Sequence, residues 1–168
     1  RLRLWSFDNF GEDLIANVRA GGVYYWDTSA KTLGTDRAVA LSALTGANLT
    51  PTKGLQVLVS DVDRHVIVLG ADPISGGSRS GSIDPLLIAF SDQENPAEWE
   101  PRSDNTAGSL RCSAGSEIIG GLRARQETLV WTDVALYSLQ FVGTPLTFGL
   151  NLINEGVSLI GPNAAINT

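Results

Sequence analysis

The apolar residues of this chain fall into short runs, and this pattern limits the possible folds more than any other feature. Runs such as "VYYWDT" (23–28), "HVIVLGA" (65–71) and "TLVWTD" (128–133) are rich in Val, Ile, Leu, Tyr and Trp. Gly-Gly pairs and Asn95-Pro96 mark turns between such runs. Short apolar runs bounded by turn residues are typical of β-strands. The sequence therefore predicts an all-β protein.

One segment could form a helix instead. In "DRAVALSALTG" (36–46) the apolar residues recur at the helical period of 3.6. Val39 and Leu41 also alternate with small residues, as they would in a strand. The pattern leaves both structures open for this segment.

Three stretches share the order polar pair, apolar run, turn, apolar run and polar exit. The equivalent residues Leu14, Val66 and Leu129 lie 52 and 63 residues apart. Propeller blades of four strands need about 40 to 50 residues, and more where a loop is inserted. The Gly/Ser-rich segment 73–83 has the composition of a flexible inserted loop. We predict about three propeller-like blades of antiparallel strands in one all-β region, 1–168, with units at 2–54, 55–115 and 116–168; a β-sandwich is the alternative.

The charge of the chain argues against a nucleic-acid-binding surface. Eighteen acidic and twelve basic residues give a net charge of −6. Proteins that grip phosphates carry a basic stripe, and the densest basic spot here is the pair Arg123 and Arg125, which we interpret as a solvated face. A single cysteine, Cys112, excludes an internal disulfide and a multi-cysteine metal site. We expect no cofactor and no metal. No run of eighteen apolar residues occurs, so we also expect no membrane partner.

Catalytic signatures are weak. The only histidine, His65, opens an apolar run, and we interpret it as an edge or packing residue. Glu98 and Glu100 are two residues apart, so they can share one strand face, as a pair of glycosidase carboxylates would require. Charged pairs are common on surfaces, and we expect no enzyme activity. We expect the aromatic residues to fill blade interiors rather than to form a sugar-stacking platform; they are Trp5, Tyr24, Tyr25, Trp26, Trp99, Trp131 and Tyr137.

The stretch "AFSDQENPAEWEP" (89–101) has the residues of either an active site or a tight turn. Serine and aspartate side chains hydrogen-bond nearby backbone groups in turns, and Asn-Pro favours an extended residue followed by a fixed φ. A tryptophan after such a turn can anchor it to the sheet. We interpret the stretch as a structural turn motif, similar to the Asp-box hairpins of sialidase-type propellers although their glycine is absent. Its residues are Ser91, Asp92, Asn95, Pro96 and Trp99.

Several phrases of the sequence, in order, resemble the β-propeller tail proteins of short-tailed bacteriophages. The phrases are "WSFDNFGEDLIANVRAGGVYYWD", "LIAFSDQENPAEWEP", "IIGGLRARQETLVWTDVALYSLQFVG" and "FGLNLINEGVSLIGPNAA". Such proteins form the tail nozzle or the plug that stabilises packaged DNA. They are several hundred residues long, so the resemblance implies that this chain is a fragment of a larger propeller.

The resemblance implies a structural, non-enzymatic role in the virion. It implies a homo-oligomeric ring, often of six subunits, that contacts other tail proteins such as the portal and adaptor. Genomic DNA would pass through the ring without specific binding, and a chain without a basic stripe is compatible with sliding DNA. Two alternatives remain open: a glycan-binding or glycan-degrading tail module, and a propeller domain for protein interaction.

Overall fold

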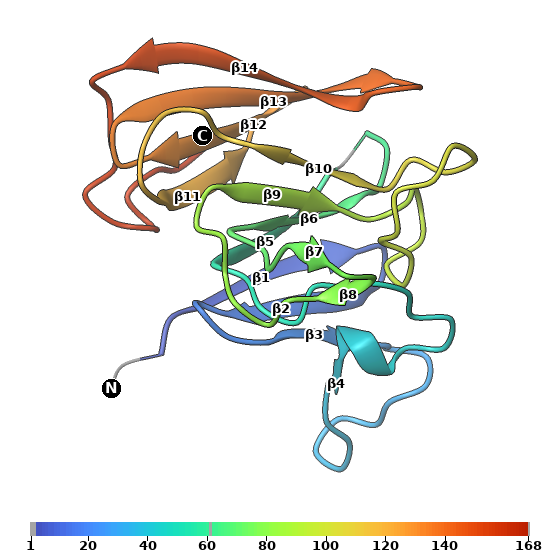
Figure 1. Ribbon diagram of the computed structural model, residues 1–168. Coiled ribbons are helices and arrows are strands. Elements are labelled where there is room, and N and C mark those ends of the chain that lie inside the picture. The colour runs from blue at the N-terminus through green and yellow to red at the C-terminus, as the bar shows by residue number, and fades with distance from the viewer. Residues whose placement is uncertain (1–2, 61, 168) are drawn as a thin grey trace.

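The computed structural model describes residues 3–60 and 62–167, so residues 2, 61 and 168 of the predicted units lie outside the described part. The prediction of an all-β fold is confirmed. Three four-stranded antiparallel sheets contain twelve of the fourteen strands of the described residues, and we call them blades 1, 2 and 3 in chain order. They are stacked from bottom to top in Figure 1.

Each blade is a meander in which successive strands are neighbours. Blade 1 contains β1 (Trp5–Phe10), β2 (Asp13–Val18), β3 (Val23–Trp26) and β4 (Val39–Ala40). Blade 2 contains β5 (Gln56–Val59), β6 (Val66–Leu69), β9 (Leu87–Phe90) and β10 (Gly108–Arg111). Blade 3 contains β11 (Ile118–Arg123), β12 (Thr128–Thr132), β13 (Ala135–Gly143) and β14 (Thr147–Glu155). This strand order is that of propeller-like blades, and the described residues form no closed ring.

Two ambiguous segments take definite structures. The segment with both helical and strand character splits into β4 and a single 3-10 turn, η1 (Leu41–Ala43). The Gly/Ser-rich insertion 73–83 is not a featureless loop, because it contains the hairpin of β7 (Ile74–Ser75) and β8 (Ser78–Arg79). Buried Asp72 holds this hairpin: its carboxylate accepts hydrogen bonds from Gly81 N and from Thr52 N and Oγ1.

Apolar side chains fill the two spaces between consecutive blades. Alternate residues of a strand point to opposite faces, so blade 2 supplies one set of side chains to each space. Between blades 1 and 2 the core contains Phe10, Ile15, Val23, Tyr25, Leu41, Val57, Val59, Val66, Val68, Ala71, Ala89 and Trp99. Between blades 2 and 3 it contains Leu55, Leu58, Ile67, Leu69, Leu86, Ile88, Phe90, Cys112, Ile118, Val130, Ala135, Tyr137, Leu139 and Phe148.

Polar side chains join the first strands of consecutive blades. From β1, Ser6 Oγ accepts a hydrogen bond from Val57 N (3.1 Å), and Asp8 Oδ2 accepts one from Val59 N (2.8 Å). The amide of Gln56 on β5 accepts from Gly121 N and donates to Gly121 O, both at 2.8 Å. Side chains of one first strand thus form hydrogen bonds with backbone groups on the edge of the next first strand. Buried backbone groups need such partners.

Arg123 closes this set of contacts. Its Nη1 donates to Val59 O (3.1 Å) and lies 3.3 Å from Asp8 Oδ1, so one guanidinium on β11 reaches both β5 and β1. The interpretation of Arg123 as part of a solvated face is therefore wrong. Its partners lie 64 and 115 residues away in the chain, and a sequence pattern does not show such distant pairing.

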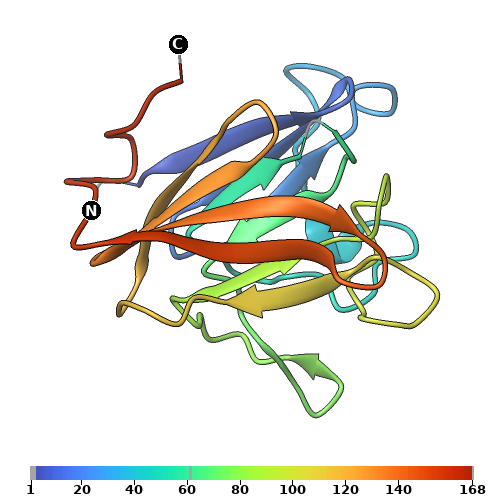
Figure 2. The ribbon, with the colours of Figure 1, turned by 90° about the horizontal axis from the view of Figure 1, so that it is seen from above.

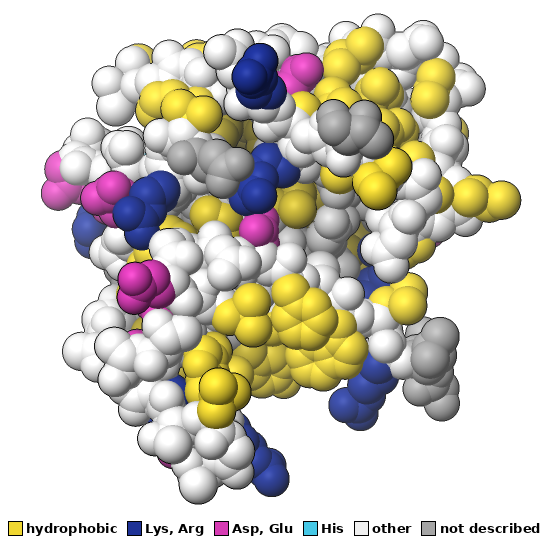
Figure 3. Space-filling model, turned by 180° about the vertical axis from the view of Figure 1, so that it is seen from behind, with side chains coloured by type: hydrophobic (Ala, Val, Ile, Leu, Met, Phe, Trp, Pro, Cys, Tyr) yellow, Lys and Arg dark blue, Asp and Glu magenta, His cyan; other side chains and the backbone are white. Residues whose placement is uncertain are grey.

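The face of blade 1 that points away from blade 2 is uncovered. Strand register places Trp5 and Phe7 beside Val18 and Ala16, and Tyr24 follows on β3. The rings of Trp5 and Phe7 are stacked with centroids 5.9 Å apart, and Phe7 is 59% exposed. Figure 3 shows hydrophobic side chains gathered over the lower half of the molecule, where blade 1 lies. The expectation that the aromatic residues fill blade interiors is wrong for Trp5. Tyr24 and Trp26 are half-buried, and the remaining four are buried, namely Tyr25, Trp99, Trp131 and Tyr137.

Candidate functional site

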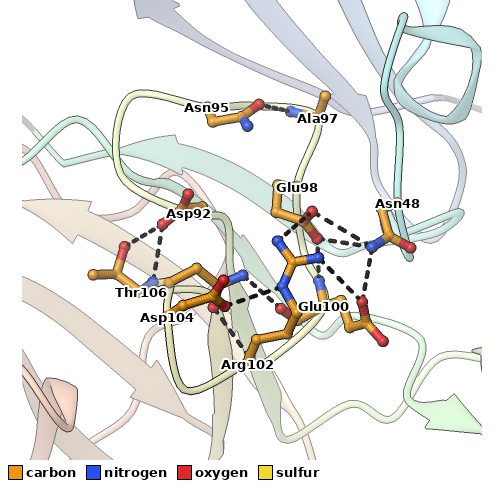
Figure 4. A network of polar contacts seen from close by, with 10 residues as sticks. Asn48, Asp92, Asn95, Ala97, Glu98, Glu100, Arg102, Asp104 and Thr106 are labelled. Carbon is orange, nitrogen blue, oxygen red and sulfur yellow. Dashed lines mark hydrogen bonds and ion pairs between the residues drawn. The ribbon is translucent and has the colours of Figure 1, made fainter.

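Ser91 and Asp92 begin the loop between β9 and β10, and both are hydrogen-bonded to backbone. Buried Ser91 Oγ accepts a bond from Val66 N (3.0 Å) and donates one to Asp92 O (2.9 Å). Asp92 Oδ1 accepts bonds from Thr106 N (2.9 Å) and Thr106 Oγ1 (2.7 Å) at the other end of the loop. These two side chains therefore close the loop at its base, as Figure 4 shows for Asp92.

Asn95, Pro96 and Trp99 form the tip and the anchor of the same loop. Asn95 Oδ1 accepts a hydrogen bond from Ala97 N (3.0 Å) across Pro96, which is the geometry of an Asx turn. Trp99 is 1% exposed and packs in the core between blades 1 and 2. Its Nε1 donates to Pro96 O (2.8 Å). The turn thus directs a large apolar side chain into the core and satisfies its one polar atom.

The carboxylates of Glu98 and Glu100 share two partners, the Asn48 amide and the Arg102 guanidinium. Asn48 Nδ2 donates to Glu98 Oε1 (3.1 Å) and Glu100 Oε2 (3.0 Å). Arg102 Nη2 lies 3.1 Å from Glu98 Oε2, and its Nη1 lies 3.5 Å from Glu100 Oε2 (Figure 4). A general acid must deliver its proton to a substrate, whereas both carboxylates here are occupied by the Arg102 guanidinium and the Asn48 amide. The pair has the contacts of a loop clamp and not those of a glycosidase acid.

His65 lies at the centre of a buried polar network that the sequence does not reveal. The side chain is fully buried, with Nδ1 bonded to Asp63 and Nε2 2.9 Å from Thr106 Oγ1. Ser60 Oγ donates to the same aspartate. The rings of Phe90 and Phe148 stand edge-on to the imidazole. An aspartate, a histidine and a hydroxyl in a row is also the order of the groups in a hydrolase triad.

The hydroxyl of Thr106 is not available as a nucleophile. A hydroxyl has one donor and two acceptor positions. Thr106 Oγ1 donates its one proton to Asp92 Oδ1 and accepts from Gln93 N (2.9 Å), so that proton is not directed at His65 Nε2. A general base would instead have to accept the hydroxyl proton. The network joins the β5–β6 turn to both ends of the 91–106 loop, so its hydrogen bonds hold these two segments together.

Asp92 has a perturbed acidity that fits this structural role. Burial by itself would raise the pKa of the Asp92 carboxyl, but hydrogen bonds from Thr106 N, Thr106 Oγ1 and Gln93 N favour the ionised form, and the net result is a lowered pKa. The carboxylate is therefore charged at neutral pH and is held by the backbone of its own loop.

The sequence pattern identified only part of this site. Ser91, Asp92, Asn95, Pro96 and Trp99 could be chosen because Ser, Asp and Asn-Pro have local turn chemistry. The partners His65 and Asn48 come from other segments, and Thr106 lies 14 residues beyond Asp92 in the same loop; their residue types carry no signal for this pairing.

Comparisons with known proteins add no assignment. No protein-family model and no curated protein matches the chain. Within residues 3–60 and 62–167, no group of three or more His, Cys, Asp or Glu side chains is arranged to hold a metal ion. No helix in the same residues is long and apolar enough to cross a membrane.

Proposed function

We propose that this chain is a structural, non-enzymatic component of a bacteriophage tail, in which its blades form part of a propeller-like ring. The ring is a nozzle or hub on the path of the DNA, and it belongs to the virion. The order of sequence phrases that resembles short-tailed phage tail proteins supports this proposal.

The observation that carries the proposal is the way the blades are joined. Three sequential meanders stack face to face, and Ser6, Asp8 and Gln56 link their first strands through backbone groups. This arrangement joins the blades into one wall. The polar groups near the first strands are hydrogen-bonded to one another. Since Arg123 is paired with Asp8, it is not free to grip phosphates, which favours passage of DNA over binding.

The uncovered face of blade 1 indicates that the wall continues. Trp5 and Phe7 are exposed on this face, and the half-buried ring of Tyr24 lies beside Trp5, so together they form an apolar surface. Large exposed apolar patches mark interaction sites. A further blade packed on this face completes the proposed ring, in an oligomer with portal and adaptor as neighbours.

A glycan-binding tail module is the second candidate, because one observation favours it. The exposed rings of Trp5 and Phe7 are stacked with nearly parallel planes, at an angle of 9°, and exposed aromatic rings can stack on sugars. Hydrolysis is less favoured than binding, since Arg102 pairs with both glutamates that were the best acid candidates.

Electron microscopy of the full-length protein tests the proposal. We expect discrete rings, and we expect antibodies against the chain to label the tails of intact virions. A monomer that depolymerises capsule polysaccharide, and whose Glu98→Gln and Glu100→Gln variants keep the fold but lose that hydrolysis, would refute the structural role and favour the glycan module. As a matched control, Glu94→Gln alters an exposed glutamate outside the clamp.

A further inference from the structure

Strand β14 leaves one edge of blade 3 open. It is the last strand of the sheet, and among the described residues only β13 pairs with it. At nine residues, β14 and β13 are the longest strands of the described chain. The β13–β14 hairpin lies at the top of the molecule in Figure 1, and Figure 2, seen from above, shows it crossing over the other strands. A long row of backbone donors and acceptors on this edge therefore faces outward.

This edge lacks the charges that usually protect edge strands. Residues 134–154 form the longest stretch of the sequence without Asp, Glu, Lys, Arg or His. Leu152 is 45% exposed and Ile153 is 52% exposed near the end of β14. Natural edge strands are commonly guarded by lysines, prolines or short length. An uncharged, long edge with exposed apolar residues is instead suited to pairing with another strand.

We propose that β14 pairs in an antiparallel manner with β14 of a second copy of this chain, about a two-fold axis. A two-fold contact brings each charged group near its own copy, and this chain carries a net charge of −6. The uncharged hairpin is the surface where a self-contact meets least electrostatic repulsion. The contact lies on the last strand of blade 3, so it does not depend on the proposed function or on what covers blade 1.

The strand itself suggests a register centred on Asn151. With this residue on the axis, Leu150 of one copy lies opposite Leu152 of the other. Both leucines share a face with Leu139 and Tyr137, to which they are paired within blade 3, so the pairing extends the apolar layer. Glu155 then lies opposite Thr147, and the two Glu155 side chains are separated by about 27 Å along the strands, beyond the range of strong repulsion.

Analytical ultracentrifugation of the full chain tests the contact. We expect a dimer in the micromolar range, and we expect Ile153→Lys to weaken it at least tenfold because the substitution puts a lysine, a usual guard residue of edge strands, at the pairing edge. Leu33→Lys is the matched control: Leu33 is 88% exposed in a loop of blade 1, and this variant should dimerise as the wild type does. Both variants should keep the wild-type circular dichroism spectrum.

A second variant tests the register. Asn151→Cys places two thiols on the axis at a cross-strand distance that permits a disulfide, so mild oxidation should yield a covalent dimer. Leu33→Cys should not give one, and buried Cys112 should not contribute. The proposal is overturned by a wild-type monomer at about 100 µM, by an unlinked Asn151→Cys dimer, or by a dimer that survives Ile153→Lys and is lost in Phe7→Ser. That last result would place the contact on blade 1.

Discussion

Replacing Trp99 with alanine should destabilise the protein strongly. The side chain is the largest of the fully buried ones, and it lies between blades 1 and 2 with Ile15 and Val57 in the same cluster. Removing a buried tryptophan costs about 3 to 5 kcal/mol, through lost transfer free energy and the cavity left behind. The substitution also leaves Pro96 O without the hydrogen bond from Nε1. For a domain of this size the loss corresponds to a drop in melting temperature of roughly 6 to 20 °C.

The measurement is urea unfolding followed by circular dichroism, with the midpoint and slope fitted together. Trp5→Ala is the control, because it removes the same side chain from an exposed face and should cost under about 1 kcal/mol. Trp99→Phe keeps most of the side-chain volume, and its loss of unfolding free energy should lie between those of the two alanine variants. It can therefore be compared with Trp5→Ala if Trp99→Ala does not fold. A Trp99→Ala variant as stable as Trp5→Ala would refute the role of Trp99 as the anchor of the turn.

Three further substitutions or treatments test the contacts described above. Gln56→Ala removes both hydrogen bonds to Gly121 between blades 2 and 3 and should cost about 1 to 3 kcal/mol in urea unfolding, whereas Gln93→Ala, an exposed side chain, should cost almost nothing. Asp92 has a lowered pKa, so its stabilising effect is complete above about pH 4 and is lost as the pH falls through the folded-state pKa; the stability gap between wild type and Asp92→Asn should therefore be largest at neutral pH and shrink toward pH 3, and a constant gap would contradict this. Burial raises the pKa of the Cys112 thiol to about 11, so iodoacetamide at pH 8 should modify it only after urea unfolds the protein, and rapid labelling of the folded chain would show that the thiol is accessible.

The sequence predicted the elements whose causes are local. Apolar runs of strand length became β3, β6 and β12, because alternating or continuous β-branched and aromatic residues fit a pleated sheet whatever surrounds them. The loop of Asp92 and Trp99 could be interpreted from its own residues, since Asx turns and proline act over a few positions.

Features that depend on distant pairing could not be predicted. His65 meets Thr106 across 41 residues, and Asp8 meets Arg123 across 115. A lone histidine or arginine has the same local pattern on a solvated face as in a buried network, so composition alone cannot separate the two cases. The exposure of Trp5 was also missed, because an aromatic residue in an alternating strand shows which face it lies on but not what covers that face.

The polar residues of the first strands explain why the blades stack in one register. Apolar faces alone tolerate sliding, since the hydrophobic effect is not directional. The bonds from Ser6 and Asp8 to β5, and from Gln56 to β11, fix the height of each blade against the next. Arg123 donates back from blade 3 to Val59 O of blade 2, but in the three contacts just named the side chain comes from the earlier blade in the chain. By this rule, the edge of β1 should accept contacts from polar side chains of a sheet that packs on the uncovered face of blade 1. Polar first-strand residues such as Ser6, Asp8 and Gln56 are the sequence feature to seek in any blade that completes the proposed ring.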